Sequence, residues 1–244
     1  MARMRTKEES ETVQAVSRAL VILEALARAG GPLALTDLAN KVGLKLTTVH
    51  RLLSTLMTHG FAEQEQATLR YRLGLKAFEI GNAALSTMDI RSTARPFLKD
   101  LVEQLNETTN LAILDRGEVV YIDQLESTNI VIVKMFARVG SRGPAHCTGS
   151  GKALLAGLPD DELGSTLSRI NLDRFTERTL TDPQRLLAEI RRIRAQGYAL
   201  DHGERDEGVC CVAAPIRNCE GRVVAAISVS APIPRMQEEL IQER

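Results

Sequence analysis

Aromatic residues are scarce in this chain, whose 244 residues include five Phe, three Tyr and no Trp. A hydrophobic core must therefore come from Leu, Val, Ile and Ala, and the aromatic platforms that stack single-stranded nucleic acid are not expected. With 44% hydrophobic and 25% charged residues, the composition is that of a folded globular protein. The length suffices for one large or two small domains.

Long apolar runs and a disulfide framework are missing as well. No stretch approaches about 18 consecutive apolar residues, and the N-terminal MARMRTKEESET is charged without an apolar segment. We therefore expect neither a membrane span nor a secretory signal, and we predict a cytoplasmic protein with no membrane partner. The four cysteines form no C-x-x-C pair and are expected to be reduced and mostly buried: Cys147, Cys210, Cys211 and Cys219.

Positive charge is concentrated in the N-terminal part, although the whole chain carries no net charge. Residues 1–76 hold 11 Lys and Arg against 7 Asp and Glu, an excess of four, whereas residues 77–244 hold 20 against 24. Such an excess on a small domain is compatible with phosphate contact, but many domains that bind no nucleic acid show as much.

The N-terminal part has the pattern of a helix-turn-helix. Apolar residues recur at three- and four-residue steps over 13–29, which predicts an amphipathic helix that buries Val16, Leu20, Leu23 and Leu26. Thr36 is expected to cap a short second helix, Gly43 to supply a tight turn, and a third helix to cover about 46–58. Residues 61–73 then predict a two-stranded hairpin, which would be a wing.

Beyond the hairpin the pattern changes to connecting helices and then to a sheet with helices packed against it. The connecting helices are predicted at 76–86 and 89–105. Strands are predicted at 111–115, 119–125, 130–136, 198–201, 209–216 and 223–230, and further helices at 151–157, 160–167 and 183–196. The predicted fold class is therefore α+β.

Six short motifs follow one another along the chain. They are TTVHRLL at 47–53, HGF at 59–61, YRLG at 71–74, PAHCTGSGKALLA at 144–156, GVCCVAAP at 208–215 and AISVSAP at 226–232. In this order they resemble the IclR family of bacterial transcriptional regulators. The resemblance implies a winged helix-turn-helix DNA-binding domain (1–75), a linker helix that dimerises (76–88) and a C-terminal GAF-like α/β effector-binding domain (89–244). It also implies a homodimer or a dimer of dimers on double-stranded operator DNA.

The polar side of the third predicted helix carries groups that reach phosphates and base edges in a major groove. The candidate DNA-binding residues are Lys45, Thr47, Thr48, His50, Arg51 and Ser54. Arg51 either forms a bidentate pair with guanine, worth roughly 1–3 kcal/mol of discrimination, or clamps a phosphate. The alternative interpretation is a solvated face on a generic three-helix core, or a head that serves protein contacts.

A glycine-rich loop at 140–151 leads into a helix that is predicted to begin at Ser150 or Gly151. Such a junction favours an anion, because unpaired backbone N–H groups and the positive end of the helix dipole point to the same place. The loop is not a nucleotide P-loop, since Lys152 is not followed by Ser or Thr and His146 replaces the first glycine of that motif.

Strand alternation and the family resemblance together define a candidate effector pocket. Ser228 and Ser230 point to one face of their strand, whereas Cys210 and Cys211 point to opposite faces of theirs. The family's ligand-bound pockets imply an apolar wall from Ile132 and Met135 and a polar lining from Gly149, Ser150, Asp201, Cys211, Ser228 and Ser230. Such a mixture suits a small organic acid or a hydroxylated carboxylate.

Other chemistry on the same residues defines the competing hypotheses. Thiols, an imidazole and a carboxylate are the ligands that zinc prefers, but their spacing here matches no zinc motif, so no metal and no cofactor is predicted. A cysteine nucleophile would need His146 or His202 as its base. The predicted function is a transcriptional regulator, not an enzyme, whose promoter binding responds to a small organic acid. The alternatives are a metal- or redox-responsive sensor, or a small-molecule enzyme, on the C-terminal domain.

Overall fold

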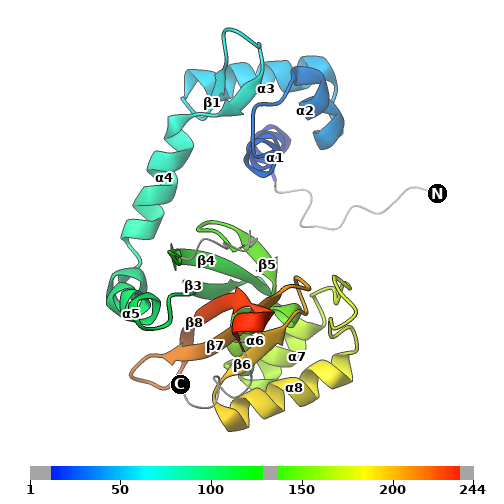
Figure 1. Cartoon of the computed structure of the whole chain (residues 1–244). Coiled ribbons are helices and arrows are strands. Elements are labelled where there is room, and N and C mark those ends of the chain that lie inside the picture. Colours follow the sequence, from blue (N-terminus) through cyan, green and yellow to red (C-terminus); the bar gives the residue numbers. More distant parts are fainter. Residues whose placement is uncertain (1–11, 129–136, 237–244) are drawn as a thin grey trace, which may run out of the picture. The chain divides into compact units, whose positions relative to one another are not determined.

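The structure is a computed structural model that describes residues 12–128 and 137–236. Its internal contacts divide the chain into two compact units that meet in the sequence between Thr87 and Met88, and each unit is described by itself (Figure 1). In the described ranges no helix is both long enough and apolar enough to cross a bilayer.

The first unit is a helix-turn-helix followed by a hairpin, as the sequence predicts. Its elements are α1 (Gln14–Arg28), α2 (Leu35–Val42), α3 (Leu46–Thr58), the antiparallel strands β1 (Ala62–Gln64) and β2 (Tyr71–Leu73), and α4 (Leu75–Ser86). Gly43 follows α2 with a φ of 65°, and its N–H bonds back to the last turn of the helix, so this residue makes the predicted tight turn before α3.

The core of this unit lies between α1, α2, α3 and the hairpin. Its buried residues are Ile22, Leu26, Leu38, Ala39, Val49, Leu53, Leu56, Ala62 and Tyr71. The predicted buried face of α1 is wrong in part, because Val16 and Leu20 are 56% and 54% exposed while Ile22 is completely buried. Helix α1 carries apolar residues on more than one face, and their spacing alone does not tell which face meets α2 and α3.

The segment that leads into α2 is held by the hairpin rather than by a cap. Leu33 and Tyr71 exchange two backbone hydrogen bonds of 2.8 and 2.7 Å. Helix α2 has no side-chain cap, so the capping role predicted for Thr36, which lies in the first turn, is wrong. A β-carbon on Gly74 would lie 2.2 Å from the Gly60 carbonyl oxygen, so the hairpin closes tightly against the end of α3.

Helix α4 completes the first unit without a buried residue. Its apolar side chains Leu75, Phe78 and Ile80 are 65%, 68% and 51% exposed. Large apolar side chains left exposed in this way are typical of a helix that meets another molecule. The predicted boundaries at 1–75, 76–88 and 89–244 stay a prediction.

The second unit contains an antiparallel sheet in the order β5-β4-β3-β8-β7-β6. Its strands are β3 (Thr108–Asp115), β4 (Glu118–Leu125), β5 (Arg142–Pro144), β6 (Ala199–His202), β7 (Val209–Arg217) and β8 (Val223–Pro232). Its helices are α5 (Asp89–Leu105), η2 (Ala145–Cys147), α6 (Gly149–Ala156), α7 (Asp160–Leu167), α8 (Pro183–Gln196) and η3 (Ile233–Arg235). The α+β class is confirmed; the strand predicted at 130–136 lies outside the described residues, and the sequence does not predict β5.

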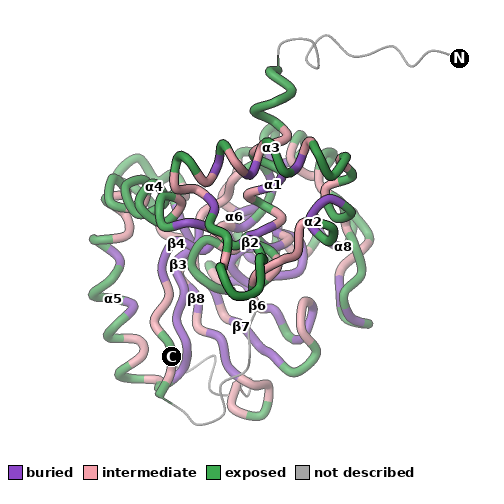
Figure 2. The backbone as a smooth tube through the Cα atoms, turned by 90° about the horizontal axis from the view of Figure 1, so that it is seen from above, coloured by how far each residue is buried: buried purple, intermediate pink, exposed green. Residues whose placement is uncertain are grey.

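Helices cover both faces of the sheet. Helix α5 lies along β3, β4 and β8, near the side chains of Val212 and Ala214 on β7. Helix α6 lies on the opposite face, where its first residue meets Cys211 and Ala213. Figure 2 shows that buried residues follow the strands, whereas α4 is exposed along its length.

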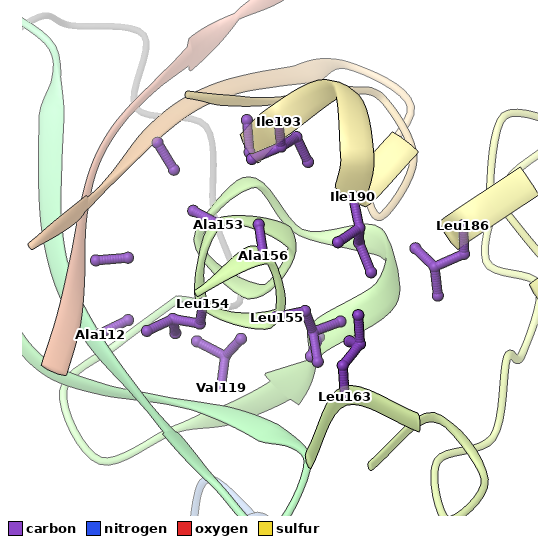
Figure 3. Close-up of a cluster of buried hydrophobic side chains, with 14 of the residues drawn as sticks. Ala112, Val119, Ala153, Leu154, Leu155, Ala156, Leu163, Leu186, Ile190 and Ile193 are labelled. Carbon is purple, nitrogen blue, oxygen red and sulfur yellow. The ribbon is translucent and has the colours of Figure 1, made fainter. Parts of the chain in front are cut away.

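Every residue of α6 is buried. Its apolar residues at 153–156 pack among the sheet, α7 and α8 (Figure 3), against Ala112, Val119, Leu163, Leu186, Ile190 and Ile193. A β-carbon on Gly151 would lie 2.4 Å from both Cα and the carbonyl oxygen of Ala145, so only glycine lets α6 approach η2 this closely.

We predict that Gly151→Ala lowers the free energy of unfolding by roughly 1–3 kcal/mol, because the added methyl overlaps backbone atoms. Gly164→Ala in α7 is the matched control, since nothing lies within 4 Å of a β-carbon there, and it should raise the free energy of unfolding by about 0.4–1 kcal/mol. Urea unfolding followed by circular dichroism measures both. Equal stabilities of the two variants would contradict the close packing of α6.

Candidate nucleic-acid interface and effector site

Helix α3 presents the predicted DNA-binding residues away from the core. Its buried residues are spaced three and four apart, at Val49, Leu53 and Leu56. The predicted residues lie outside this stripe, and those that are exposed are Lys45, Thr47, His50 and Arg51. Thr48 and Ser54 are half-buried at the edge of the stripe. The structure therefore brings all six to one helix, with Lys45 immediately before its first residue.

Most of these side chains have no partner within the protein. In the described residues, the side chains of five of them make no hydrogen bond or ion pair, namely Lys45, Thr47, Thr48, His50 and Arg51. The Ser54 hydroxyl donates to the His50 carbonyl oxygen at 3.0 Å and keeps its acceptor capacity. Unpaired polar groups along an exposed helix are free to bind base edges and phosphates.

The hairpin adds a cation that the sequence analysis does not single out. Arg72 pairs with Glu63 at 3.0 Å and with Glu65 at 3.8 Å. Arg70 is exposed, and its side chain makes no ion pair or hydrogen bond with the described residues. The sequence places both arginines at the end of the predicted wing loop, and only the pairing in space shows that Arg70 is the free one.

In the second unit, polar side chains form two rows across the face of the sheet that α6 covers. Asp201, Cys211 and Ser230 lie directly opposite one another on β6, β7 and β8. Ser228 lies two residues along β8, beside Asn110 of β3. The Asn110 amide nitrogen is 3.5 Å from the Ser228 hydroxyl and 3.4 Å from the Ser230 hydroxyl. Four predicted residues are thus brought together, and Asn110 joins them.

The N-terminus of α6 meets these rows. The helix begins at Gly149, earlier than predicted, and Thr148 caps it by accepting the Gly151 N–H at 3.2 Å. A β-carbon on Gly149 would lie 2.9 Å from the Cys211 sulfur. The Ser150 N–H and the hydroxyls of Ser228 and Ser230 face that sulfur and lower the pKa of the Cys211 thiol, which burial raises. The start of the helix and the polar rows therefore form one site.

A cavity of about 20 Å³ lies at this junction. The predicted residues that line it are Gly149, Asp201, Cys211 and Ser230. The other lining residues are not among those predicted from the sequence; they are Tyr121, Ala137, Thr148, Asp206 and Val209. Ser150 and Ser228 are buried but do not line the cavity, and the Ser150 hydroxyl has no hydrogen-bond partner in the described residues. Ile132 and Met135 lie outside the described residues.

Asp201 is buried, and burial raises its pKa to about 7. Its Oδ1 accepts the Glu204 N–H at 2.7 Å, so the carboxyl also closes the turn after β6. Near neutral pH both protonation states are populated, and the protonated form can donate a hydrogen bond to a ligand. A neutral Asp201 therefore tolerates a carboxylate ligand beside it.

The buried cysteines are protonated at neutral pH. Burial raises the pKa of Cys147 and Cys210 to about 12 and that of Cys211 to about 11. Since the thiolate is the nucleophile and the metal ligand, these thiols give no support to a redox or nucleophilic role. His146 donates its Nε2–H to the Asp173 carbonyl oxygen at 3.0 Å. Across 12–128 and 137–236, no group of three His, Cys, Asp or Glu side chains is placed to hold a metal ion.

Two family models match most of the chain. The bacterial transcriptional regulator IclR C-terminal model matches residues 82–244, and the IclR helix-turn-helix domain model matches residues 15–66. The chain belongs to the IclR family. IclR-family regulators combine the helix-turn-helix seen in the first unit with a C-terminal effector domain, which corresponds to the second.

Relatives in the IclR family match nearly the whole chain. The HTH-type transcriptional regulator XynR of Escherichia coli K12 is 39% identical, over 93% of this chain and 89% of the relative. The transcriptional repressor IclR of the same organism is 36% identical, over 95% and 84%. These relatives are named as regulators and not as enzymes.

Solved structures of the family agree with the fold. The crystal structure of Thermotoga maritima IclR has a TM-score of 0.75 and 32% identity, and the match covers 93% of this chain and 91% of that one. An IclR homolog from Microbacterium hydrocarbonoxydans, complexed with 4-hydroxybenzoate, has a TM-score of 0.80 and 27% identity, over 94% and 93%. That homolog therefore binds a small aromatic acid.

We predict that one thiol per native chain reacts rapidly with Ellman's reagent at pH 7. Cys219 is exposed, whereas Cys147, Cys210 and Cys211 are buried, and a buried protonated thiol reacts slowly. In denaturant all four cysteines of the chain should react, and Cys219→Ser should abolish the fast reaction of the native protein. Rapid labelling of the Cys219→Ser variant would contradict the burial of the cavity thiol.

Proposed function

We propose that this chain is a cytoplasmic regulator whose affinity for double-stranded operator DNA changes when a small organic acid occupies the cavity at the start of α6. The observation that carries the DNA-binding part is the row of unpaired polar side chains on α3, among them His50 and Arg51. A recognition helix needs such groups because base edges and phosphates must be met by free donors and acceptors.

Self-association is part of the proposal. Helix α4 exposes Leu75, Phe78 and Ile80 and buries none of its residues. A second copy of the chain would cover apolar side chains of this helix, as the family resemblance implies. Two heads in one homodimer, or in a dimer of dimers, would then bind half-sites about one helical turn of DNA apart, roughly 34–36 Å.

The cavity supports a coupling between ligand and DNA. Its volume of about 20 Å³ holds roughly one water molecule, so a carboxylate can enter only if a wall moves. The walls that meet there are the start of α6, with Gly149, and the end of β6 with the loop after it, with Asp201 on the strand and Asp206 on the loop. A ligand that binds the opened arrangement more tightly shifts the population toward it, and only this difference in affinity can alter DNA binding.

We predict that Arg51→Ala weakens binding to the promoter next to the protein's own gene by roughly 1–3 kcal/mol if the guanidinium pairs with guanine. If Arg51 contacts a phosphate, binding weakens equally for all DNA sequences. The slope of the logarithm of the binding constant against the logarithm of the salt concentration then decreases in magnitude by about one. Fluorescence anisotropy at several salt concentrations separates the two cases. Arg28→Ala is the control, because this exposed side chain pairs with Glu24 at the end of α1. Unchanged promoter affinity of Arg51→Ala would contradict the proposal, as would equal affinity of the wild type for unrelated DNA.

We predict that carboxylate binding weakens as the pH rises through about 7, the pKa of Asp201. Below this pH the side chain is neutral, and above it two negative charges face each other in a buried site. Calorimetry with glycolate, lactate, malate and 4-hydroxybenzoate at pH 6 and pH 8 tests this. Asp201→Asn should bind with little pH dependence, and the control Asp161→Asn, on the exposed side of α7, should behave like the wild type. Wild-type binding that is equal at both pH values would refute the role of Asp201.

A further inference from the structure

Lys152 is the largest fully buried side chain in the described residues. A buried ammonium group needs counter-charges, and Lys152 has two. It contacts the carboxylate of Glu204, in the loop after β6, and its Nζ is 3.4 Å from the carboxylate of Glu189 on α8. Glu189 also pairs with Arg192 at 2.9 Å. Two cations and two anions therefore balance one another.

Glu204 connects this cluster to the effector cavity. Its N–H donates to Oδ1 of Asp201 at 2.7 Å. Its carbonyl oxygen accepts the Thr179 hydroxyl at 2.7 Å and the Thr176 hydroxyl at 3.3 Å. The residue is thus held by its side chain and by its backbone, and the place of Asp201 depends on both.

Lys152 joins the two walls of the cavity without lining it. One wall is the start of its own helix, where Gly149 meets Cys211. The other wall is the end of β6, which carries Asp201, together with the following loop, which carries Glu204. Loss of the ion pair would remove the contact between the Glu204 side chain and α6. The residues that line the cavity would all be unchanged.

We propose that Lys152 is a positioning residue of the effector cavity: through its ion pair with Glu204 it holds the Asp201 carboxyl against the start of α6 and controls whether the cavity accepts a carboxylate. The role in ligand binding rests on the proposed function. The effect on Asp201 itself does not, and it is measurable without any ligand.

The charges around Asp201 provide that measurement. The titratable and charged groups that face it are Lys152 on α6, Glu204, Arg205 and Asp206 in the loop, Cys147 in η2, Cys210 and Cys211 on β7, and Tyr121 on β4. Glu204 raises the pKa of Asp201 and Lys152 lowers it. Removing the Glu204 charge should therefore lower the titration midpoint of Asp201, and removing the Lys152 charge should raise it.

The experiment is a carboxyl ¹³C NMR titration of the full-length protein labelled at aspartate, with Asp201→Asn to assign the signal. The wild-type midpoint is expected near pH 7. Glu204→Gln should lower it, because the negative charge that raises the pKa of Asp201 is removed, while Lys152 keeps Glu189 as its partner. The double variant Lys152→Met/Glu204→Gln should raise the midpoint again, above that of Glu204→Gln.

Lys99→Met is the matched control, since this lysine is exposed on α5 and pairs with Glu103 alone; its midpoint should equal that of the wild type. Equal midpoints for Glu204→Gln and the double variant would overturn the proposal, because a lysine that only fills space does not act on the charge of Asp201. Lys152→Met alone would leave the Glu204 charge buried and unpaired, which can prevent folding. The double variant removes both charges of the pair, so it can be measured even if Lys152→Met does not fold.

A second arm measures binding of the four-acid panel at pH 6. We expect Lys152→Met to weaken the affinity for these acids by about tenfold, because the Asp201 carboxyl is no longer held at the start of α6. Wild-type affinity in this variant would overturn the positioning role. If the wild type binds none of the four acids, the effector part of the proposed function fails for this panel, and the NMR titration still decides whether Lys152 controls Asp201.

Discussion

The close approach of α6 to the sheet is the constraint on which the second unit depends. Glycine permits it at two places, because a β-carbon on Gly149 would collide with Cys211 of β7 and one on Gly157 with Val223 of β8. Gly151 permits the equally close approach of the helix to Ala145 of η2. A helix buried along its whole length must find partners for its first N–H groups inside the protein. The Thr148 hydroxyl accepts one of them, the Gly151 N–H, and the cavity lies where the start of the helix meets the sheet. The same burial forces Lys152 to pair with carboxylates.

The two units differ in how far their polar side chains are paired within the protein. On α3, the side chains of Thr47, His50 and Arg51 have no partner in the described residues, and this suits a large, charged and hydrated partner whose contacts are made at the surface. Around α6, most buried polar groups already have partners, and the Asp201 carboxyl is held by Glu204. Such a site suits a small ligand that exchanges a few hydrogen bonds while a wall moves.

Local sequence patterns predicted the helix-turn-helix well, whereas contacts between residues far apart in the sequence could not be predicted from it. Helix α3 was predicted at about 46–58 and has these bounds, because Gly43 and His59-Gly60 punctuate it on both sides. Alternation placed Ser228 and Ser230 on one face correctly, but which of them lines the cavity depends on strand register. The buried face of α1 was misjudged because its apolar residues surround more than one side. The burial of Lys152 could not be foreseen, since its partners Glu189 and Glu204 lie 37 and 52 residues away.

The proposed function requires that occupation of the cavity at the start of α6 and operator binding by α3 are thermodynamically coupled. Reciprocity tests it most directly: the factor by which the ligand changes operator affinity must equal the factor by which operator DNA changes ligand affinity. Both can be measured on the full-length protein, by anisotropy with and without saturating acid and by calorimetry with and without saturating operator. The account predicts the same factor, different from one, in both titrations. A ligand affinity that operator DNA leaves unchanged would contradict it.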